Sequence, residues 1–197
     1  MDEKVYFFDF WKTLAYSDFK GINLKKYLEF SDEEFLYYQN FLFRTNLKYE
    51  EIYEVIQKEF SLNKEQILQI KNLNQNIENN SKLYLDTIDT LKSLSQIHQI
   101  YLISDGFSVT ERIFNKLIPK GLFTETFFSY KYNKIKSEGL IQIVLNELKK
   151  DSSEVHFIGD SIKRDYNPCQ NLGIKCTLID RNQNKQNSKV ITTLNEI

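Results

Sequence analysis

This 197-residue chain has few cysteines, prolines and glycines: two, two and six respectively. Cys169 and Cys176 are seven positions apart, so they form neither a CxxC pair nor a disulfide framework. With only two histidines in the chain, a zinc site is not expected, and both cysteines are predicted to be small buried thiols. No low-complexity linker and no internal repeat is visible.

The chain also lacks an excess of charge of either sign, since 26 basic and 27 acidic residues give a net charge of -1. This balance argues against nucleic-acid or acidic-membrane partners. No apolar run approaches the ~18 residues that a membrane span needs. The first residues, MDEKVYFFDF, place acids before a short apolar run, unlike a secretory signal. We therefore expect a cytoplasmic protein.

Hydrophobic residues make up 41 % of the chain, which is enough for one core with a small insert. An apolar strand is expected at 5–8. Residues 15–83 then show helical spacing without proline, which predicts three or four amphipathic helices in a small bundle. Ser31 and Asn63, each followed three residues later by Glu or Gln, predict the starts of two of these helices.

From residue 84 onward, short apolar strands alternate with helices, as in a parallel sheet covered on both faces. Strands are expected at 99–103, 127–130, 155–158 and 175–179, and helices at 86–94, 110–117, 138–148 and 166–172. Residues 182–189 are expected to form a solvated loop or tail. The predicted fold is a doubly wound (Rossmann-like) α/β core, residues 1–14 and 84–197, with an inserted α-helical cap, residues 15–83.

Polar side chains follow three of the predicted strands, at the point where each strand ends. Asp9, Ser104 and Asp160 occupy these positions. Open α/β sheets bind their ligands at the carboxyl ends of the strands. If the three strands are neighbours, these groups converge in one crevice, which we predict to be a functional site.

Four stretches of the sequence resemble, in order, the four motifs of the haloacid-dehalogenase-like hydrolases. They are FFDFWKTL at 7–14, LISDGF at 102–107, the lysine of IKSEGL at 135–140, and FIGDSIKRDY at 157–166. GIKCTLIDR at 173–181 is similar to the strand that follows the last motif. The resemblance covers the predicted core. The helical insert lies where one class of the family carries a C1-type cap, and together with SDGF it is most similar to the phosphoserine-phosphatase branch.

The resemblance implies a nucleophile and a magnesium site. Asp9 would attack phosphorus to give an aspartyl-phosphate. Mg²⁺ would be held by Asp9, Asp160 and the backbone carbonyl of Trp11, with Asp165 as a further member of the set. Asp165 would bind the ion, hold its water or orient Lys136, and these alternatives stay open.

The resemblance also implies a group of donors for the phosphoryl oxygens. Ser104 and the backbone N–H groups of Asp105 and Gly106 would hold these oxygens. Lys136 would neutralise both Asp9 and the transferring group. Lys134 is the rival for this role, and we prefer Lys136 because it directly precedes the helix that leads to the Asp160 strand.

Trp11 departs from the family pattern, because family phosphatases carry an aspartate two residues after the nucleophile. That aspartate protonates the leaving oxygen and later activates water, which is typically worth ~10²–10⁴-fold in rate. An indole cannot transfer a proton. The protein would then use another donor (Lys12, the cap or the substrate), act on a leaving group that needs no proton, be a dehalogenase, or be a weakened member that binds a phosphorylated ligand.

Among these alternatives, metal-dependent phosphomonoester hydrolysis ranks first. A dehalogenase, in which Asp9 attacks carbon and an aromatic at the +2 position is normal, predicts no metal, yet Asp160 and Asp165 follow the pattern of the metal-binding members. A cap of about seventy residues favours a small phosphorylated metabolite. We expect an amino-acid or amino-alcohol phosphate first and a sugar phosphate second.

Other candidate residues receive ordinary structural roles. The many aromatics of the cap are expected in the bundle core, with two or three of them lining the substrate pocket. Arg44 is the cap's only arginine and is expected at the surface, although it could pair with a substrate anion. His156 lies on a predicted buried strand, where we expect a hydrogen-bonded core histidine.

Overall fold

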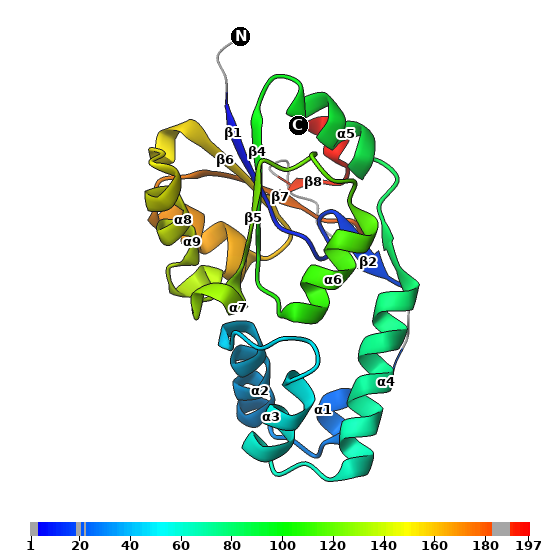
Figure 1. The fold of residues 1–197 in the computed structure, drawn as a ribbon. Helices are drawn as coiled ribbons and strands as arrows, with labels where there is room; N and C mark the ends of the chain where they lie inside the picture. Colours follow the sequence, from blue (N-terminus) through cyan, green and yellow to red (C-terminus); the bar gives the residue numbers. More distant parts are fainter. Residues whose placement is uncertain (1–3, 19–20, 22, 183–189) are drawn as a thin grey trace.

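A computed structural model describes residues 4–18, 21, 23–182 and 190–197. In this part of the chain, a six-stranded parallel sheet has the order β5-β4-β1-β6-β7-β8 (Figure 1). The strands are β1 (Val5–Phe8), β4 (Gln99–Ser104), β5 (Glu125–Phe128), β6 (Val155–Gly159), β7 (Lys175–Ile179) and β8 (Val190–Ile191). This arrangement confirms the predicted doubly wound α/β class. Residues 183–189 of the predicted tail lie outside the described residues.

Helices cover both faces of the sheet because alternate strand residues point to opposite sides. On one face, Tyr6 and Phe8 of β1 belong to the same hydrophobic cluster as Ile113. On the other face, Phe7 shares a cluster with Val144. The first face packs against α5 (Thr87–Ser95) and α6 (Ser108–Leu117), and the second against α8 (Leu140–Leu148) and α9 (Asn167–Asn171). β1 is thus buried on both sides.

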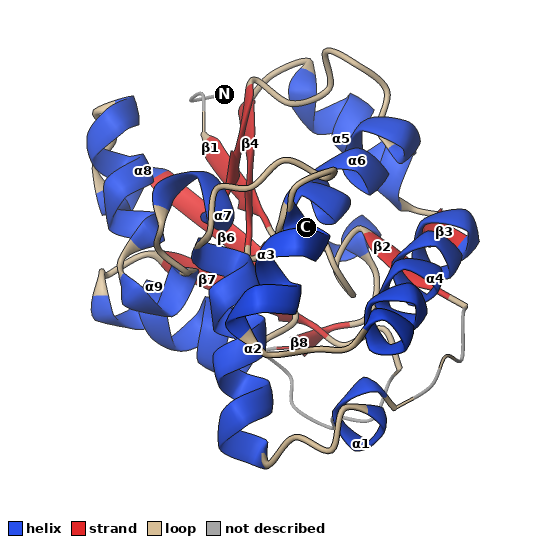
Figure 2. Ribbon diagram, turned by 60° about the horizontal axis from the view of Figure 1, so that its bottom comes forward, coloured by secondary structure: helices blue, strands red, loops and turns tan. Residues whose placement is uncertain are grey.

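The insert between β1 and β4 forms a helical body with a hydrophobic cluster of its own, centred on residues such as Ile52, Ile56 and Ile70. Its helices are α1 (Leu24–Tyr27), α2 (Asp32–Arg44), α3 (Ile52–Glu59) and α4 (Lys64–Asn80). Figure 1 shows this body below the carboxyl-terminal edge of the sheet, and Figure 2 views it from that side. Both predicted helix starts, at Ser31 and Asn63, are confirmed, and each carries a capping box.

A short antiparallel pair, β2 (Ala15–Ser17) and β3 (Ser81–Leu83), joins the insert to the core. The sequence did not predict these strands, since three residues are too few to establish a period of two. We call residues 15–83, which include this pair and α1–α4, the helical insert. Within the described residues, no helix has both the length and the hydrophobicity to cross a lipid bilayer.

Two predicted elements differ in detail from the structure. The strand expected at 127–130 begins and ends two residues earlier, and Ser129 opens the short helix α7 (Ser129–Tyr132). The helix expected at 166–172 is preceded by a π-helical segment, Ile162–Tyr166. Wide turns of this kind occur often at functional sites. As predicted, His156 is hydrogen-bonded, with its Nε2 2.7 Å from Thr177 Oγ1, but the residue is half-buried and not part of the buried core.

Candidate active site

Asp9 lies at the carboxyl end of the central strand, where β1 runs between β4 and β6. Its backbone N–H donates to the carbonyl of Ile158 at 2.9 Å, so the parallel ladder fixes its position. The residue is only 6 % exposed. The sheet therefore presents one buried carboxylate at the edge where ligands of such folds bind.

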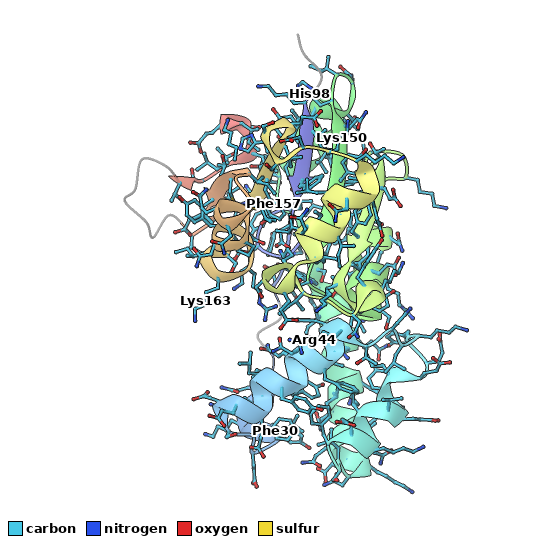
Figure 3. All side chains as sticks on the ribbon, turned by 90° about the vertical axis from the view of Figure 1, so that its left-hand side faces the viewer. Phe30, Arg44, His98, Lys150, Phe157 and Lys163 are labelled. Carbon is cyan, nitrogen blue, oxygen red and sulfur yellow. The ribbon has the colours of Figure 1, made fainter. Side chains whose placement is uncertain are left out.

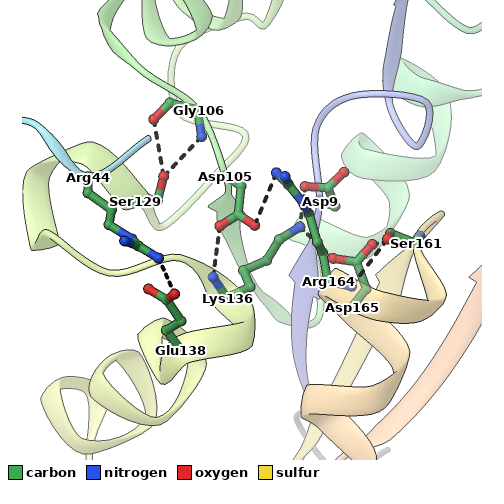
Figure 4. A network of polar contacts seen from close by, with 10 residues as sticks. All are labelled: Asp9, Arg44, Asp105, Gly106, Ser129, Lys136, Glu138, Ser161, Arg164 and Asp165. Carbon is green, nitrogen blue, oxygen red and sulfur yellow. Dashed lines mark hydrogen bonds and ion pairs between the residues drawn. The ribbon is translucent and has the colours of Figure 1, made fainter. Parts of the chain in front are cut away.

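Lys136 lies beside Asp9. It begins the 3-10 turn Lys136–Glu138, is 3 % exposed, and places its Nζ 2.6 Å from Asp9 Oδ1. The same ammonium contacts Asp165 Oδ1 (Figure 4). Burial alone would lower the pKa of Lys136, but the carboxylates of Asp165 and Asp9 raise it, so the group stays charged. Lys134, the rival in the sequence, is exposed.

Three carboxylates converge at this point. Oxygens of Asp9, Asp160 and Asp165 lie within 4.8 Å of one another. Gly159 makes room for this approach, because a Cβ there would lie 2.4 Å from Asp165 Oδ2. The structure thus brings together the acidic residues that the sequence proposed as neighbours, and it explains why glycine precedes Asp160.

The carboxylates oppose one another electrostatically. The pKa of Asp9 is raised to about 8: burial is the largest cause, Lys136 opposes it, and the charges of Asp165 and Asp160 add to it. Burial, followed by Asp165, also raises the pKa of Asp160. Three acidic groups around one ammonium leave an excess of negative charge, and carboxylate oxygens are the ligands that Mg²⁺ prefers. The donor set therefore fits a divalent cation.

Asp165 is the most constrained of the three. One of its oxygens contacts Lys136, and the other accepts the Ser161 N–H at 2.9 Å. Its side chain is fully buried. Of the three roles left open by the sequence, these contacts favour the orientation of Lys136.

The expected phosphoryl donors are only partly available. Gly106 donates its N–H to Ser129 Oγ at 3.0 Å, and the same hydroxyl donates back to the Gly106 carbonyl, so this amide would have to exchange partners to hold a phosphoryl oxygen. Ser129 was not predicted to take part in the site, because the predicted strand 127–130 included it. Ser104 ends β4, is fully buried, and its hydroxyl has no hydrogen-bond partner among the described residues.

Two cavities lie at this edge, between the core and the helical insert. The smaller, of about 410 Å³, contains Asp9, Lys136, Asp160 and Asp165 in its lining. The larger, of about 880 Å³, includes aromatic and amide residues in its lining: Trp11, Tyr16, Gln39, Phe43, Asn74, Tyr84, Phe107 and Asn182. Among the aromatic residues of helices α1–α4, Phe43 is the one that lines these two cavities, whereas we expected two or three.

The insert meets the core at two cationic contacts beside the smaller cavity. Arg44 at the end of α2 forms an ion pair with Glu138, so it pairs with the protein and not with the site (Figures 3 and 4). Arg164 lies over the Phe43 ring, 5.0 Å from its centroid. Arg164 is not among the predicted site residues, although its position directly before Asp165 in the last motif was an available signal.

Trp11 is one of the residues that line both cavities. The indole ring packs edge-on against Phe10, with centroids 5.1 Å apart. Its Nε1 lies 3.5 Å from Thr110 Oγ1, at the long limit of a hydrogen bond. The side chain therefore shapes the cavity but offers no group that exchanges a proton.

Comparison with known proteins agrees with this geometry. The family model described as haloacid dehalogenase-like hydrolase matches residues 6–179, whereas no curated protein matches. A haloacid dehalogenase family enzyme from Bacteroides thetaiotaomicron, crystallised with magnesium and inorganic phosphate, is 16 % identical with a TM-score of 0.66, over 94 % of this chain and 98 % of that one.

Two further solved structures are similar over nearly their whole length. A haloacid dehalogenase family phosphatase from Thermococcus onnurineus is 20 % identical with a TM-score of 0.64, over 98 % of this chain and 95 % of that one. A 2-haloacid dehalogenase from Pseudomonas syringae is 14 % identical with a TM-score of 0.64, over 99 % and 96 %. At these identities the likeness establishes the fold.

Proposed function

Because this chain belongs to the haloacid dehalogenase-like hydrolases, we propose that it hydrolyses a small phosphomonoester with Mg²⁺, through an aspartyl-phosphate on Asp9. The observation that carries this proposal is the buried cluster of Asp9, Asp160 and Asp165 around the ammonium of Lys136. Such a cluster holds both a cation and a nucleophilic carboxylate in one place.

Each residue has a defined part in this reaction. Asp9 presents one carboxylate oxygen for attack on phosphorus, and Lys136, paired with that carboxylate, keeps it oriented and neutralises the incoming phosphoryl charge. Asp160 and the Trp11 carbonyl complete the cation site. Bound Mg²⁺ would offset the charge of the carboxylates and the phosphoryl oxygens. Asp165 fixes Lys136, and the orphan hydroxyl of Ser104 is a further candidate donor to phosphate.

The helical insert serves as a cap in this proposal, with residues 1–14 and 84–197 as the catalytic core. Its helix α2 supplies Gln39 and Phe43 to both cavities. A cap over the site excludes water and large substrates, as lids do in other enzymes. An amino-alcohol, amino-acid or sugar phosphate is small enough for the larger cavity of about 880 Å³.

Turnover of p-nitrophenyl phosphate tests the proposed reaction, because its leaving group needs no proton. We expect release of p-nitrophenolate and phosphate with Mg²⁺ and loss of turnover in EDTA, with activity restored by excess Mg²⁺. A panel of phosphorylated metabolites then identifies the natural class. Absence of turnover with every ester would contradict the proposal and favour a member that only binds a phosphorylated ligand.

Dehalogenation of a 2-haloacid is the second candidate, favoured by the aromatic Trp11 at the wall of the site and by a dehalogenase among the structural relatives. In that reaction Asp9 would attack carbon and no metal would be required. Halide release from a 2-haloacid in EDTA tests it directly. The excess of negative charge around Asp9 argues against it, because a cation has a reason to bind there.

A further inference from the structure

The position where the two cavities meet determines which residue can serve the leaving group. This inference rests on the proposed phosphatase function, in which the phosphoryl group lies beside Asp9 in the smaller cavity and the organic group in the larger. The breaking P–O bond then lies at their junction. The residues that line both cavities are Trp11, Lys12, Gln39, Phe43, Asp105 and Asp160.

Three of these shared residues carry a group that exchanges protons: Lys12, Asp105 and Asp160. Asp160 belongs to the carboxylate cluster of the cation site. Lys12 acts electrostatically on Asp160, whose pKa it lowers against the effect of burial. Asp105 lies outside the acidic cluster and is therefore the carboxyl group at the junction with no assigned part in holding the cation.

The two side-chain oxygens of Asp105 differ in their contacts, because one accepts a hydrogen bond and the other has only a long ion pair. Oδ1 accepts the backbone N–H of Lys136 at 2.8 Å (Figure 4). Oδ2 is buried and has no hydrogen-bond partner among the described residues, and it forms a long ion pair with Arg164, whose Nη1 is 3.7 Å away. The 2.8 Å hydrogen bond to Oδ1 fixes the whole carboxyl group, so Oδ2 is oriented before any ligand binds.

The surroundings of Asp105 favour a carboxyl group that can hold a proton. The residue is 8 % exposed, and this burial raises its pKa. The charges of Lys136 and Arg164 lower the pKa, and the carboxylate of Asp165 raises it. A general acid works best when its pKa lies nearer the working pH than that of an ordinary aspartate.

We propose that Asp105 carries the proton that the tryptophan at position 11 cannot carry. When Asp9 Oδ attacks phosphorus and the bond to the leaving oxygen breaks, the Asp105 carboxylic acid gives its proton to that oxygen, and the alcohol departs. Water then attacks the aspartyl-phosphate and loses a proton to the Asp105 carboxylate. Phosphate leaves, and both Asp9 and the protonated Asp105 are regenerated.

The Asp105→Asn variant isolates this role, because the asparagine Oδ1 can still accept the Lys136 N–H. With an alkyl phosphate we expect the first step to slow by ~10²–10⁴-fold. With p-nitrophenyl phosphate, whose leaving group needs no proton, the first step stays fast while hydrolysis of the intermediate slows. The variant therefore shows a burst of one p-nitrophenolate per enzyme and accumulates phosphorylated Asp9, detectable by intact-protein mass.

Asp89→Asn is the matched control, since it removes an exposed carboxylate on α5 that lines neither of the two cavities. It should leave the kinetics with both esters unchanged. A role of Asp105 in merely positioning Lys136 predicts instead an equal loss of the first step with both esters. That result, or unchanged kinetics in Asp105→Asn, would overturn the proposal, as would a leaving-group effect confined to Lys12→Met.

A second measurement does not depend on the variant's folding. Across a series of phosphate esters, the wild-type kcat/KM should change little with the pKa of the leaving group, because a proton donor offsets poor leaving groups. A steep dependence in the wild type would refute any such donor. A wild-type protein inert toward every ester would refute the phosphatase function itself and this assignment with it, whereas an active wild type with an unaffected variant refutes only the assignment.

Discussion

The sheet core and the helical insert both bury aromatic and aliphatic side chains, but they treat charge differently. Among the described residues, the buried charged side chains are Asp9, Asp105, Lys136 and Asp165, and all belong to the core. Among the described residues of the insert, no charged side chain is buried. In its Lys25–Asp32 ion pair, the Asp32 side chain is 94 % exposed. Buried charge is costly unless it is compensated. The concentration of buried charge at one edge of the sheet indicates that the core carries out the reaction and that the insert selects the substrate.

The largest expected effect comes from removing the nucleophile. Asp9→Asn should lower turnover by at least about 10⁴-fold, because it removes the carboxylate that forms the covalent intermediate. The fold should persist, since asparagine is isosteric and one repulsive charge is lost. Steady-state assay and thermal unfolding test both points, and full activity in this variant would refute the role of Asp9.

Next in size is the loss of the buried ammonium. Lys136→Met should reduce turnover by ~10²–10³-fold. It should also lower the free energy of unfolding by about 3 kcal/mol, because it leaves buried carboxylates without a counter-charge. Lys134→Met is the matched control, two residues away and exposed. If both variants lost turnover and stability equally, the assignment of Lys136 as the lysine paired with Asp9 would be contradicted.

Magnesium should stabilise the core in a pH-dependent manner. The pKa of Asp9 is raised to about 8 in the fold, above its ordinary 3.8, so the metal-free protein should lose stability as pH rises from about 4 to 8. At pH 8, Mg²⁺ at 100 times its Kd should add about 2.7 kcal/mol. The rise in Tm should be smaller at pH 5, where Asp9 holds its proton, and absent in Asp160→Asn. An equal rise at both pH values would contradict this account.

In the insert, Phe43→Ala should affect selection more than chemistry. The variant removes an aromatic wall of both cavities and the contact beneath Arg164. We expect KM to rise by about tenfold, equivalent to about 1.4 kcal/mol, with kcat changed less than threefold. A dominant fall in kcat would mean that the insert takes part in chemistry, which would break the contrast between the two regions.

The smallest effect is expected at the helix starts of the insert. Ser31→Ala and Asn63→Ala each remove a side chain that accepts a backbone N–H in a capping box. Each should cost about 1 kcal/mol. A drop in Tm of about 2–4 °C is then expected from a domain of this size. With a saturating ester, kcat should stay within twofold of wild type. A large fall in kcat at unchanged Tm would show that these caps control the site.

Local patterns predicted much of this architecture. Alternating strands and helices gave the core, and Ser31 and Asn63 marked helix starts correctly, because these features depend on neighbours in sequence. The strand ends at Asp9 and Asp160 predicted their convergence from the parallel topology alone. By contrast, β2 and β3 are too short to show the two-residue alternation of a strand, and their pairing joins residues that are more than sixty positions apart.

The sequence by itself determined which residue types end the strands, where the insert begins its helices, and that position 11 carries an indole that cannot exchange a proton. Only the tertiary structure decided that Ser129 takes the Gly106 amide and that Asp105 keeps one oxygen without a hydrogen bond, and it placed Lys136, already preferred over Lys134 in the sequence, against Asp9. Hydrogen bonding and burial of these groups depend on chain segments that are distant in sequence, and no local pattern encodes such distances.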